Sequence, residues 1–335
     1  MTSTAPRAVG LQRPRLRSGL DPLDPLDPLV TSAITSPVEP RTDGRVVVVG
    51  DVLDDIIVAL DRRPAVGTDT DATIRHRAGG SAANTAAWLA SQGVGVDFVG
   101  RVGSSDLHRH SLLLQNAGVT PRLLHDPLEP TGTVVITVAG TTRTMLTDRG
   151  ASAGLELASL DGALFDGAAI VHLTGYSIVQ DPTPDAFQHL VARVRAAGAL
   201  LSVDPASSGF VSSFGPAAFL DLVDGADLFF PSLDEGALLT GRDDPDAIVQ
   251  ELLPRFGAVA LTLPDGGAVA GRRGGKLVHA APSTVRLVDP VGTGDAFSAG
   301  FLAAWLKSPS LALSVRRGTK LAARARAVVG GRPAR

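Results

Sequence analysis

Near the C-terminus, residues 288–297 read Val-Asp-Pro-Val-Gly-Thr-Gly-Asp-Ala-Phe. Two closely spaced glycines, Gly292 and Gly294, precede Asp295 at the point where an apolar helix is expected to begin. Glycine lets backbone N–H groups approach an anion closely, and a helix N-terminus adds a favourable dipole. A carboxylate beside a phosphate bound there could take a proton from an attacking hydroxyl. The stretch therefore favours phosphoryl transfer to an alcohol.

The residues after this turn predict one buried helical face, because aromatic side chains recur every four positions from Phe297 to Trp305. The turn should then present its amides at a helix start. The alternative is an ordinary strand–loop–helix connection capped by Asp295, which a short glycine motif alone would favour. Asp289, at the end of the strand-like segment 284–288, strengthens the functional interpretation.

A second glycine motif precedes another expected helix. Gly79 and Gly80 are followed by a run of small residues that contains Asn84, and Gly93 is a plausible helix stop. Paired glycines permit a polyol to lie against bare backbone, and an amide one turn into the helix can donate to it and accept from it. Close helix packing, with Asn84 as a local cap, explains the motif equally well.

Apolar runs alternate with helical stretches along the chain, which indicates a parallel sheet with helices on both faces. The first run is a β-branched segment typical of a buried parallel strand. The expected strands lie at 45–50, 96–99, 169–173, 200–203, 228–230 and 258–262, and the clearest helical stretches at 185–197 and 234–239.

Two segments interrupt this alternation, near 56–77 and 131–147. The second passes through Gly140 and has the pattern of a hairpin. We expect both to form a small β-sheet lid over the edge of the main sheet where ligands bind, since a lid there excludes water.

Acidic residues follow the first strand, at Asp51, Asp54 and Asp55. A dinucleotide site would place a glycine-rich turn here, so an NAD-dependent dehydrogenase is disfavoured. Carboxylates repel phosphate and suit hydroxyl groups. Two of the three are expected to be solvated or capping, and Asp55 is the candidate ligand contact.

Two further polar motifs each have a simpler explanation. The carboxylates of Ser232-Leu-Asp-Glu235 could hold the hydration shell of Mg²⁺, but Ser232 is also a good N-cap followed by favourable first-turn acids. His108 and His110 do not share a helix face, so we expect surface residues and no metal site there.

The bulk composition narrows the function classes. The chain has 335 residues, 44% apolar residues, 4% aromatic residues, a net charge of −3 and no cysteine. These values leave a nucleic-acid partner, a membrane partner and disulfides without support, and they fit a cytoplasmic protein. Residues 1–44 contain prolines at every third position of an Asp-Pro-Leu repeat, which predicts a disordered N-terminal tail.

Together these motifs resemble the PfkB carbohydrate kinase family, also called the ribokinase-like family, over about residues 45–333. Both diagnostic glycine motifs occur in order within a strand–helix frame, which is far more specific than either alone. The resemblance implies a Rossmann-like αβα sandwich with a β lid. It also implies an ATP-dependent kinase that phosphorylates a hydroxymethyl group of a small sugar, sugar acid or nucleoside.

The resemblance also assigns roles to residues. Asp295 falls on the catalytic base, and the anion hole falls on Gly292, Thr293 and Gly294. The remaining assignments are substrate-binding positions at Asp55, Gly79, Gly80 and Asn84, nucleotide positions at Thr262, Gly267 and Thr319, and indirect Mg²⁺ binding through water at Glu235.

Some positions depart from the family pattern. Ser232 replaces the asparagine of an N-x-x-E motif, Pro290 replaces a threonine, and Pro264 interrupts a usual Thr-Leu-Gly. These changes bear on ATP affinity more than on the fold. They motivate an alternative, a non-catalytic sugar-binding or regulatory protein on the same scaffold. Many members of the family are activated by K⁺, and the resemblance implies a K⁺ site near Asp289 and Val291.

The substrate is left open by the sequence. The segment 204–208 lacks an arginine that fructokinase and ketodeoxygluconate kinase relatives carry, which favours a neutral sugar or a nucleoside over a sugar acid. Arg143 on the expected lid could still meet an anionic substrate, although a solvated hairpin residue explains it as well. Because lid edges would expose unpaired strand groups, a homodimer through the lid is expected.

Overall fold

The computed structural model describes residues 44–60, 62, 64, 66–139, 142–178 and 184–334. Apart from Gly44, the tail expected at residues 1–44 lies outside this described part. No helix within it is long and apolar enough to cross a membrane.

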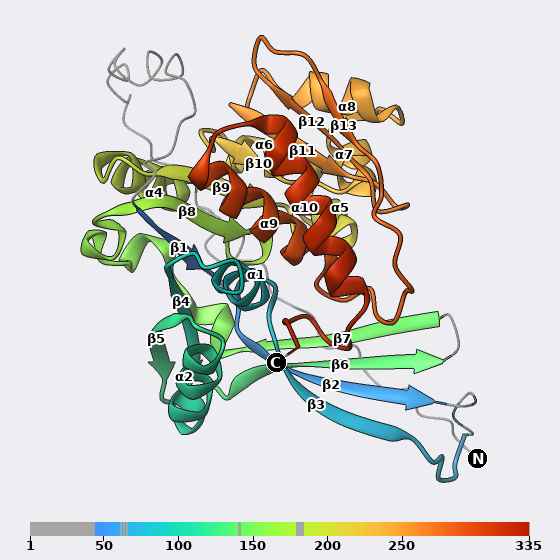
Figure 1. Cartoon of the computed structure of the whole chain (residues 1–335). Helices are drawn as coiled ribbons and strands as arrows, with labels where there is room; N and C mark the ends of the chain where they lie inside the picture. Colours follow the sequence, from blue (N-terminus) through green and yellow to red (C-terminus); the bar gives the residue numbers. More distant parts are fainter. Residues whose placement is uncertain are drawn as a thin grey trace, which may run out of the picture. The chain divides into compact units, whose positions relative to one another are not determined.

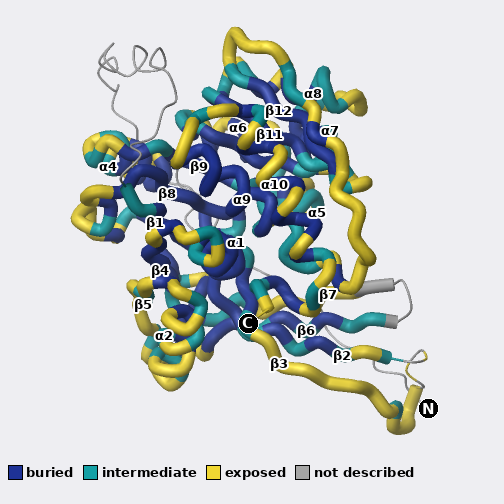
Figure 2. The backbone as a smooth tube through the Cα atoms, viewed as in Figure 1, coloured by how far each residue is buried: buried dark blue, intermediate teal, exposed yellow. Residues whose placement is uncertain are grey.

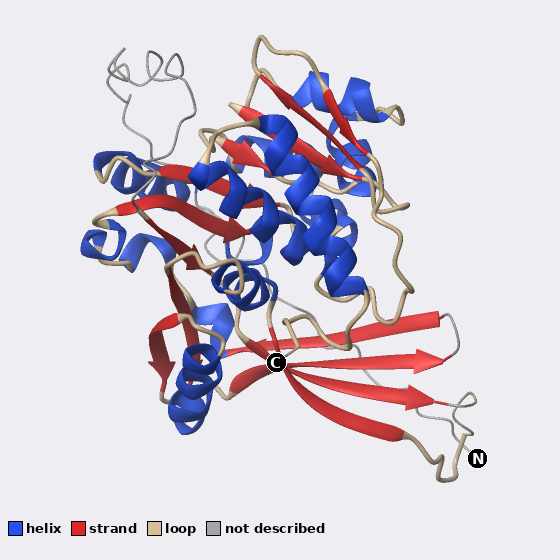
Figure 3. Cartoon of the chain, in the orientation of Figure 1, coloured by secondary structure: helices blue, strands red, loops and turns tan. Residues whose placement is uncertain are grey.

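A nine-stranded sheet forms the centre of the described fold (Figures 1 and 3). Its order is β13-β12-β11-β10-β9-β8-β1-β4-β5, and the strands from β11 across to β5 run parallel, whereas β12 and β13 are antiparallel additions. The bounds are β1 Arg45–Val49, β4 Val96–Gly103, β5 Thr120–Asp126, β8 Ala168–Thr174, β9 Leu200–Asp204, β10 Leu228–Phe229, β11 Ala258–Thr262, β12 Ala268–Arg272 and β13 Val278–Ala280.

Helices cover both faces of this sheet, as the residues of β1 show. Val46 and Val48 join a core with residues of α1, α9 and α10, whereas Val47 and Val49 point to the opposite core, with residues of α4 to α8. Burial on both faces explains the continuous β-branched run. The helices are α1 Ser81–Ala90, α2 Leu107–Asn116, α3 Gly175–Ile178, α4 Pro184–Ala196, α5 Ser208–Phe214, α6 Pro216–Leu222, α7 Leu233–Thr240, α8 Pro245–Leu252, α9 Thr293–Lys307 and α10 Leu311–Arg326.

A separate four-stranded sheet has the order β3-β2-β6-β7, and the two sheets confirm the αβα fold class with a smaller β-sheet. Its strands are β2 Leu53–Leu60, β3 Thr73–Gly79, β6 Thr131–Ala139 and β7 Thr142–Gly150. β2 pairs in parallel with β6, and the outer pairs are antiparallel, including the hairpin partners β6 and β7. Figure 2 shows that β3 is exposed along most of its length. The side chain of Arg143 lies outside the described residues.

Residues 284–288 form no strand, so that expectation was wrong. Val285, Leu287 and Val288 are 39–52% exposed, and the backbone N–H of Val288 donates to the carbonyl of Arg326 rather than to a strand. β-branched residues favour a strand only where a sheet edge and a packing surface accept them.

The histidine pair was also mispredicted in part. His108 is exposed, but His110 is fully buried, with Nε2 3.5 Å from Asp54 Oδ1. Arg109, the residue between them, donates to Asp54 Oδ1 at 2.8 Å and Oδ2 at 2.5 Å. The ion pair between Arg109 and Asp54 joins α2 to β2, the strand of the small sheet that comes first in the chain. Burial raises the pKa of Asp54, but the bonds to Arg109 and His110 outweigh it and lower the pKa overall.

The topology predicts where a ligand site should lie. From β1 the chain builds the sheet towards β5 and then, from β8 onwards, in the opposite direction. Ligands in open α/β sheets bind outside the carboxyl ends of strands at such a switch point. The residues that follow the carboxyl ends of β1, β8, β9, β10 and β11 meet there.

Candidate active site

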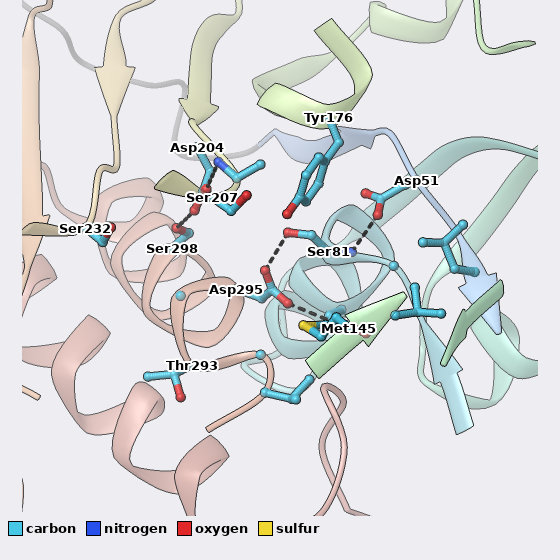
Figure 4. A pocket seen from close by; sticks show the side chains of 18 of the residues that line it. Asp51, Ser81, Met145, Tyr176, Asp204, Ser207, Ser232, Thr293, Asp295 and Ser298 are labelled. Carbon is cyan, nitrogen blue, oxygen red and sulfur yellow. Dashed lines mark hydrogen bonds between the residues drawn. The ribbon is translucent and has the colours of Figure 1, made fainter. Parts of the chain in front are cut away.

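A cavity of about 370 Å³ lies at this edge, with walls from both sheets (Figure 4). The main-sheet side contributes residues after the parallel strands and the start of α9, and the small sheet contributes β2, β6 and β7. The polar lining residues are Asp51, Asp55, Ser81, Asn84, Thr147, Arg149, Tyr176, Asp204, Ser207, Ser232, Glu235, Thr262, Thr293, Asp295 and Ser298.

Asp295 lies in the first turn of α9 and is held by the first turn of α1. Ser81 Oγ donates to Asp295 Oδ1 at 2.6 Å, and Asn84 Nδ2 donates to Oδ2 at 3.0 Å (Figure 4). The two glycine motifs of the sequence therefore meet at one carboxylate.

The protonation of Asp295 is set mainly by its surroundings. Burial raises its pKa to about 7, although the hydrogen bonds from Ser81 and Asn84 act in the opposite direction. The neighbouring charges of Asp51 and Asp55 raise it further. A carboxylate with this pKa can accept a proton near neutral pH and release it again.

The turn before α9 is open to an anion. Gly292 has φ +73°, and a Cβ there would lie 2.5 Å from the carbonyl oxygen of Gly331, so only glycine fits. Among the residues that the structure describes, no side chain caps the start of α9, and a Cβ at Gly294 would meet no atom within 4 Å. Gly292, Thr293 and Gly294 line the cavity at this helix start, where an anion would be stabilised, although the backbone N–H of Thr293 also donates to the carbonyl of Pro290 at 3.3 Å.

The three acids after β1 have separate roles. Asp51 is buried and caps the start of α1, although it lies 30 positions before Ser81 in the chain. Its Oδ2 accepts from Ser81 N and its Oδ1 from Ala82 N, each at 3.0 Å. Asp54 pairs with Arg109, as described above. Asp55 is buried in the cavity wall, where burial raises its pKa to about 6.

The glycines of the first motif make close approaches. A Cβ at Gly79 would lie 2.1 Å from Asp55 Oδ1, and one at Gly80 would lie 2.5 Å from the carbonyl oxygen of Asp51. Gly80 also has φ +90° and lines the cavity. The first motif is therefore needed to bring α1 against the residues after β1, in addition to any contact with a ligand.

Ser232 and Glu235 form a complete capping box on α7, which confirms the simpler expectation that Ser232 is an N-cap. Ser232 N donates to Glu235 Oε2 at 2.7 Å. Both residues nevertheless line the cavity, beside Thr262, which pairs with Ser232 through an isolated parallel bridge.

Asp204, a residue without a sequence-predicted role, lines the cavity with Glu235. Burial raises the pKa of both carboxyl groups, and the charge of Glu235 raises the pKa of Asp204 further. Asp204 accepts from Ala206 N at 2.8 Å and from Ser298 Oγ at 3.4 Å. Two mutually repelling carboxylates fit a hydrated divalent cation, since oxygen ligands and retained waters suit Mg²⁺.

The C-terminal segment completes the wall behind α1, and no motif in the sequence predicted it. Arg332 donates from Nη2 to the carbonyl of Gly79 at 2.9 Å and from Nε to Asn84 Oδ1 at 3.3 Å. Trp88 Nε1 donates to the carbonyl of Gly331 at 2.8 Å. Arg332 therefore fixes the Asn84 amide so that its Nδ2 faces Asp295.

Not every expected residue reaches the cavity. Among the described residues, the lining does not include Gly79, Gly267 or Thr319. Thr319 is buried in α10, and its hydroxyl donates to the carbonyl of Arg316 at 3.1 Å. Ser81, Asp204 and Ser298 line the cavity although no sequence motif assigned them a role. Ser81 could have been predicted, because it is the first residue of the helix that follows Gly79 and Gly80.

Comparison with known proteins agrees with this geometry. The sequence matches the model for pfkB family carbohydrate kinases over residues 43–334. It is 30% identical to fructokinase-1 of Oryza sativa subsp. japonica over 246 residues, which cover 69% of this chain and 75% of the relative.

Two solved structures show the same fold. The adenosine kinase of Sinorhizobium meliloti superposes with a TM-score of 0.77 at 24% identity, covering 87% of this chain and 96% of that one. A provisionally named ribokinase II of Escherichia coli, in complex with ATP and Mg²⁺, gives a TM-score of 0.73 at 22% identity, covering 86% and 94%.

Proposed function

The chain belongs to the pfkB family and is a carbohydrate kinase, and we propose that it transfers the γ-phosphoryl group of ATP to a hydroxymethyl group of a small sugar or nucleoside. The observation that carries this proposal is Asp295, a half-buried carboxylate with a raised pKa in the first turn of α9, in a cavity lined by both sheets. Family membership comes from the sequence match, whereas the acceptor class and the residue roles are our proposal.

Asp295 acts as the general base. The acceptor hydroxyl donates its proton to this carboxylate as its oxygen attacks the γ-phosphorus, and the bond to the leaving ADP oxygen breaks. Amides of Gly292, Thr293 and Gly294 hold the transferred phosphoryl oxygens at the start of α9. Ser81 and Asn84 orient the carboxylate, and their donated hydrogen bonds keep part of the population ionised near neutral pH.

The acceptor is bound on the α1 side of Asp295. Asp55 and Asn84 line this part of the cavity and would hold the remaining hydroxyl groups, Gly80 would bring the backbone close to them, and Gly79 would serve through its close approach to Asp55. The small sheet would serve as a lid that excludes water during transfer, because its residues from β2, β6 and β7 form one wall.

The nucleotide occupies the other part of the cavity. Thr262 lines it directly. Gly267 and Thr319 lie outside the cavity lining, and we propose that they contact the part of the nucleotide that extends beyond it. Glu235, with Asp204, would bind Mg²⁺ through water, and the ion when bound neutralises charge on the phosphates. The ATP and Mg²⁺ complex of the ribokinase II neighbour supports this choice of ligands. K⁺ activation near Asp289 and Val291, a homodimer through the small sheet and a cytoplasmic location complete the proposal.

A substrate panel tests the proposed function. ADP release is measured with ATP and Mg²⁺, with and without K⁺, against neutral sugars, nucleosides, sugar acids and sugar phosphates. We expect acceptor-dependent ADP release that Asp295→Asn removes. Binding of an acceptor without ADP release under all of these conditions would instead favour the non-catalytic alternative.

A further inference from the structure

One guanidinium in the cavity has no hydrogen-bonding or ion-pair partner in the part of the chain that the structure describes. Arg149 lines the wall from β7, and no described residue shares a hydrogen bond or an ion pair with it. Three of the cavity carboxylates, in contrast, accept hydrogen bonds: Asp51 from α1 amides, Asp295 from Ser81 and Asn84, and Glu235 from the amide of Ser232. The five N–H donors of the Arg149 guanidinium are therefore available to a ligand.

The register of the small sheet directs Arg149 into the cavity. Met145, Thr147 and Arg149 all line it, and alternate residues of a strand face the same side. Arg149 is also the penultimate residue of β7, which ends at Gly150 and leads into the buried Ala151. It is thus placed where the small sheet meets the main body.

Tyr176 holds the guanidinium in position. The Arg149 Cζ lies 4.2 Å from the centre of the Tyr176 ring, and that ring packs edge-on against Phe210, with 5.2 Å between centres. A guanidinium stacked on an aromatic face keeps its in-plane donors directed outwards, which suits bidentate binding of a planar carboxylate or a phosphate.

The location points to the acceptor and not to the nucleotide phosphates. Figure 4 shows Asp295 between Thr293, at the start of α9, and Tyr176. The transferred phosphoryl group is placed at the α9 amides, so an anion at Arg149 lies on the far side of the base from it.

We propose that the acceptor of this kinase carries an anionic group, a carboxylate or a phosphate ester, which Arg149 binds while stacked on Tyr176. The inference rests on the proposed function, because the bound anion is taken to be the acceptor of the phosphoryl group. It also revises the preference for a neutral acceptor that segment 204–208 suggested, since the arginine missing there is supplied by β7.

Binding measurements with matched ligand pairs test the inference without requiring turnover. Calorimetric titration compares D-gluconate with D-glucitol for the carboxylate, and D-fructose 6-phosphate with D-fructose for the phosphate, since each anion keeps a free hydroxymethyl group. We expect one of the two anions to bind the wild type at least roughly tenfold more tightly than its neutral partner, because charge-assisted hydrogen bonds contribute to this extent. The pair that shows the preference identifies the anion.

Arg149→Met should abolish that preference and leave the affinity for the neutral partner within about twofold, whereas Arg149→Lys, which retains charge but not the fork, should retain a part of it. Arg75→Met is the matched control, because Arg75 is exposed on β3 of the same sheet. Thermal unfolding confirms that each variant is folded.

Equal binding of anion and neutral partner by the wild type, or failure to bind either anion, overturns the inference. So does a preference that survives in Arg149→Met or that is lost equally in Arg75→Met. If the anion binds through Arg149 but no acceptor in the panel gives ADP release, the anion site stands and the proposed phosphoryl transfer is refuted.

Discussion

Ser81 and Asp295 lie 214 positions apart in the chain, and Ser81 Oγ donates a hydrogen bond of 2.6 Å to Asp295 Oδ1. The same Ser81 offers its backbone N–H to Asp51 Oδ2 at 3.0 Å. The first residue of α1 thus joins the end of β1 to the first turn of α9. This contact places the proposed base beside the part of the cavity to which we assign the acceptor, and the predictions about the base depend on it.

Asp295→Asn should lower kcat by roughly 10²–10⁴-fold, because the amide cannot accept the acceptor proton. Acceptor binding, measured by calorimetry, should change little since the side chain keeps its shape. Asp243→Asn, at an exposed position, is the control and should retain full activity. Near-normal turnover in Asp295→Asn would refute the role of the base.

The pH profile should report the base. Burial raises the pKa of Asp295 to about 7, and only the ionised carboxylate can act as the base. We therefore expect kcat/KM to be low at acidic pH and to rise as the pH increases through about 7. The bond from Ser81 lowers this pKa, so Ser81→Ala should move the acidic limb to higher pH. Ser213→Ala, at an exposed position of α5 where the hydroxyl donates to the carbonyl of Gly209, should leave the profile unchanged. An unmoved limb in Ser81→Ala contradicts the assignment.

Asp295 should also destabilise the folded protein at neutral pH. Its pKa is raised from 3.8 to about 7, so the folded state binds more protons than the unfolded state between these values. The contribution to stability is therefore lost as pH rises through this window. The Tm of Asp295→Asn should exceed that of the wild type by a few degrees at pH 8, and the difference should shrink towards pH 4. A difference independent of pH argues against the raised pKa.

The C-terminal segment should support catalysis through Asn84. A Cβ at Gly331 would lie 2.2 Å from Asn84 Nδ2, so Gly331→Ala must displace the amide that donates to Asp295. We expect kcat/KM to fall by about tenfold or more, and the free energy of unfolding to fall by about 1–3 kcal/mol. Gly209→Ala, where a Cβ would meet no atom within 4 Å, is the control for the substitution itself. Equal behaviour of the two variants excludes this role.

Glu235→Gln should separate metal binding from helix capping. Glutamine can still accept from Ser232 N, so the capping box survives, but the negative charge is lost. The Mg²⁺ concentration for half-maximal activity should rise by about 10–100-fold. Asp234→Asn changes a neighbouring first-turn acid that does not line the described cavity and should show a much smaller shift. An unaltered Mg²⁺ requirement in Glu235→Gln removes it from the metal site.

Local pattern predicted most of the fold because each element carries its own signal. The β-branched run of β1 is buried on both faces, and the glycines before α1 and α9 mark turns whose conformation or close packing other residues do not fit. The strand expected at 284–288 was wrong because its apolar side chains stay partly exposed and the backbone N–H of Val288 donates to Arg326 at the end of α10 instead of to a strand. His110 was expected at the surface because its burial against Asp54 depends on a strand distant in sequence.

The sequence by itself determined the αβα architecture, the family and the candidate base, since these follow from periodicity and from glycine motifs that are local in the chain. Only the tertiary structure decided which acids were capping and which faced the cavity, that Arg332 holds Asn84, and that Arg149 lies over Tyr176 with no ion-pair partner among the described residues. These features are contacts between residues far apart in sequence. They depend on strand register and helix packing, which no single stretch of the chain specifies.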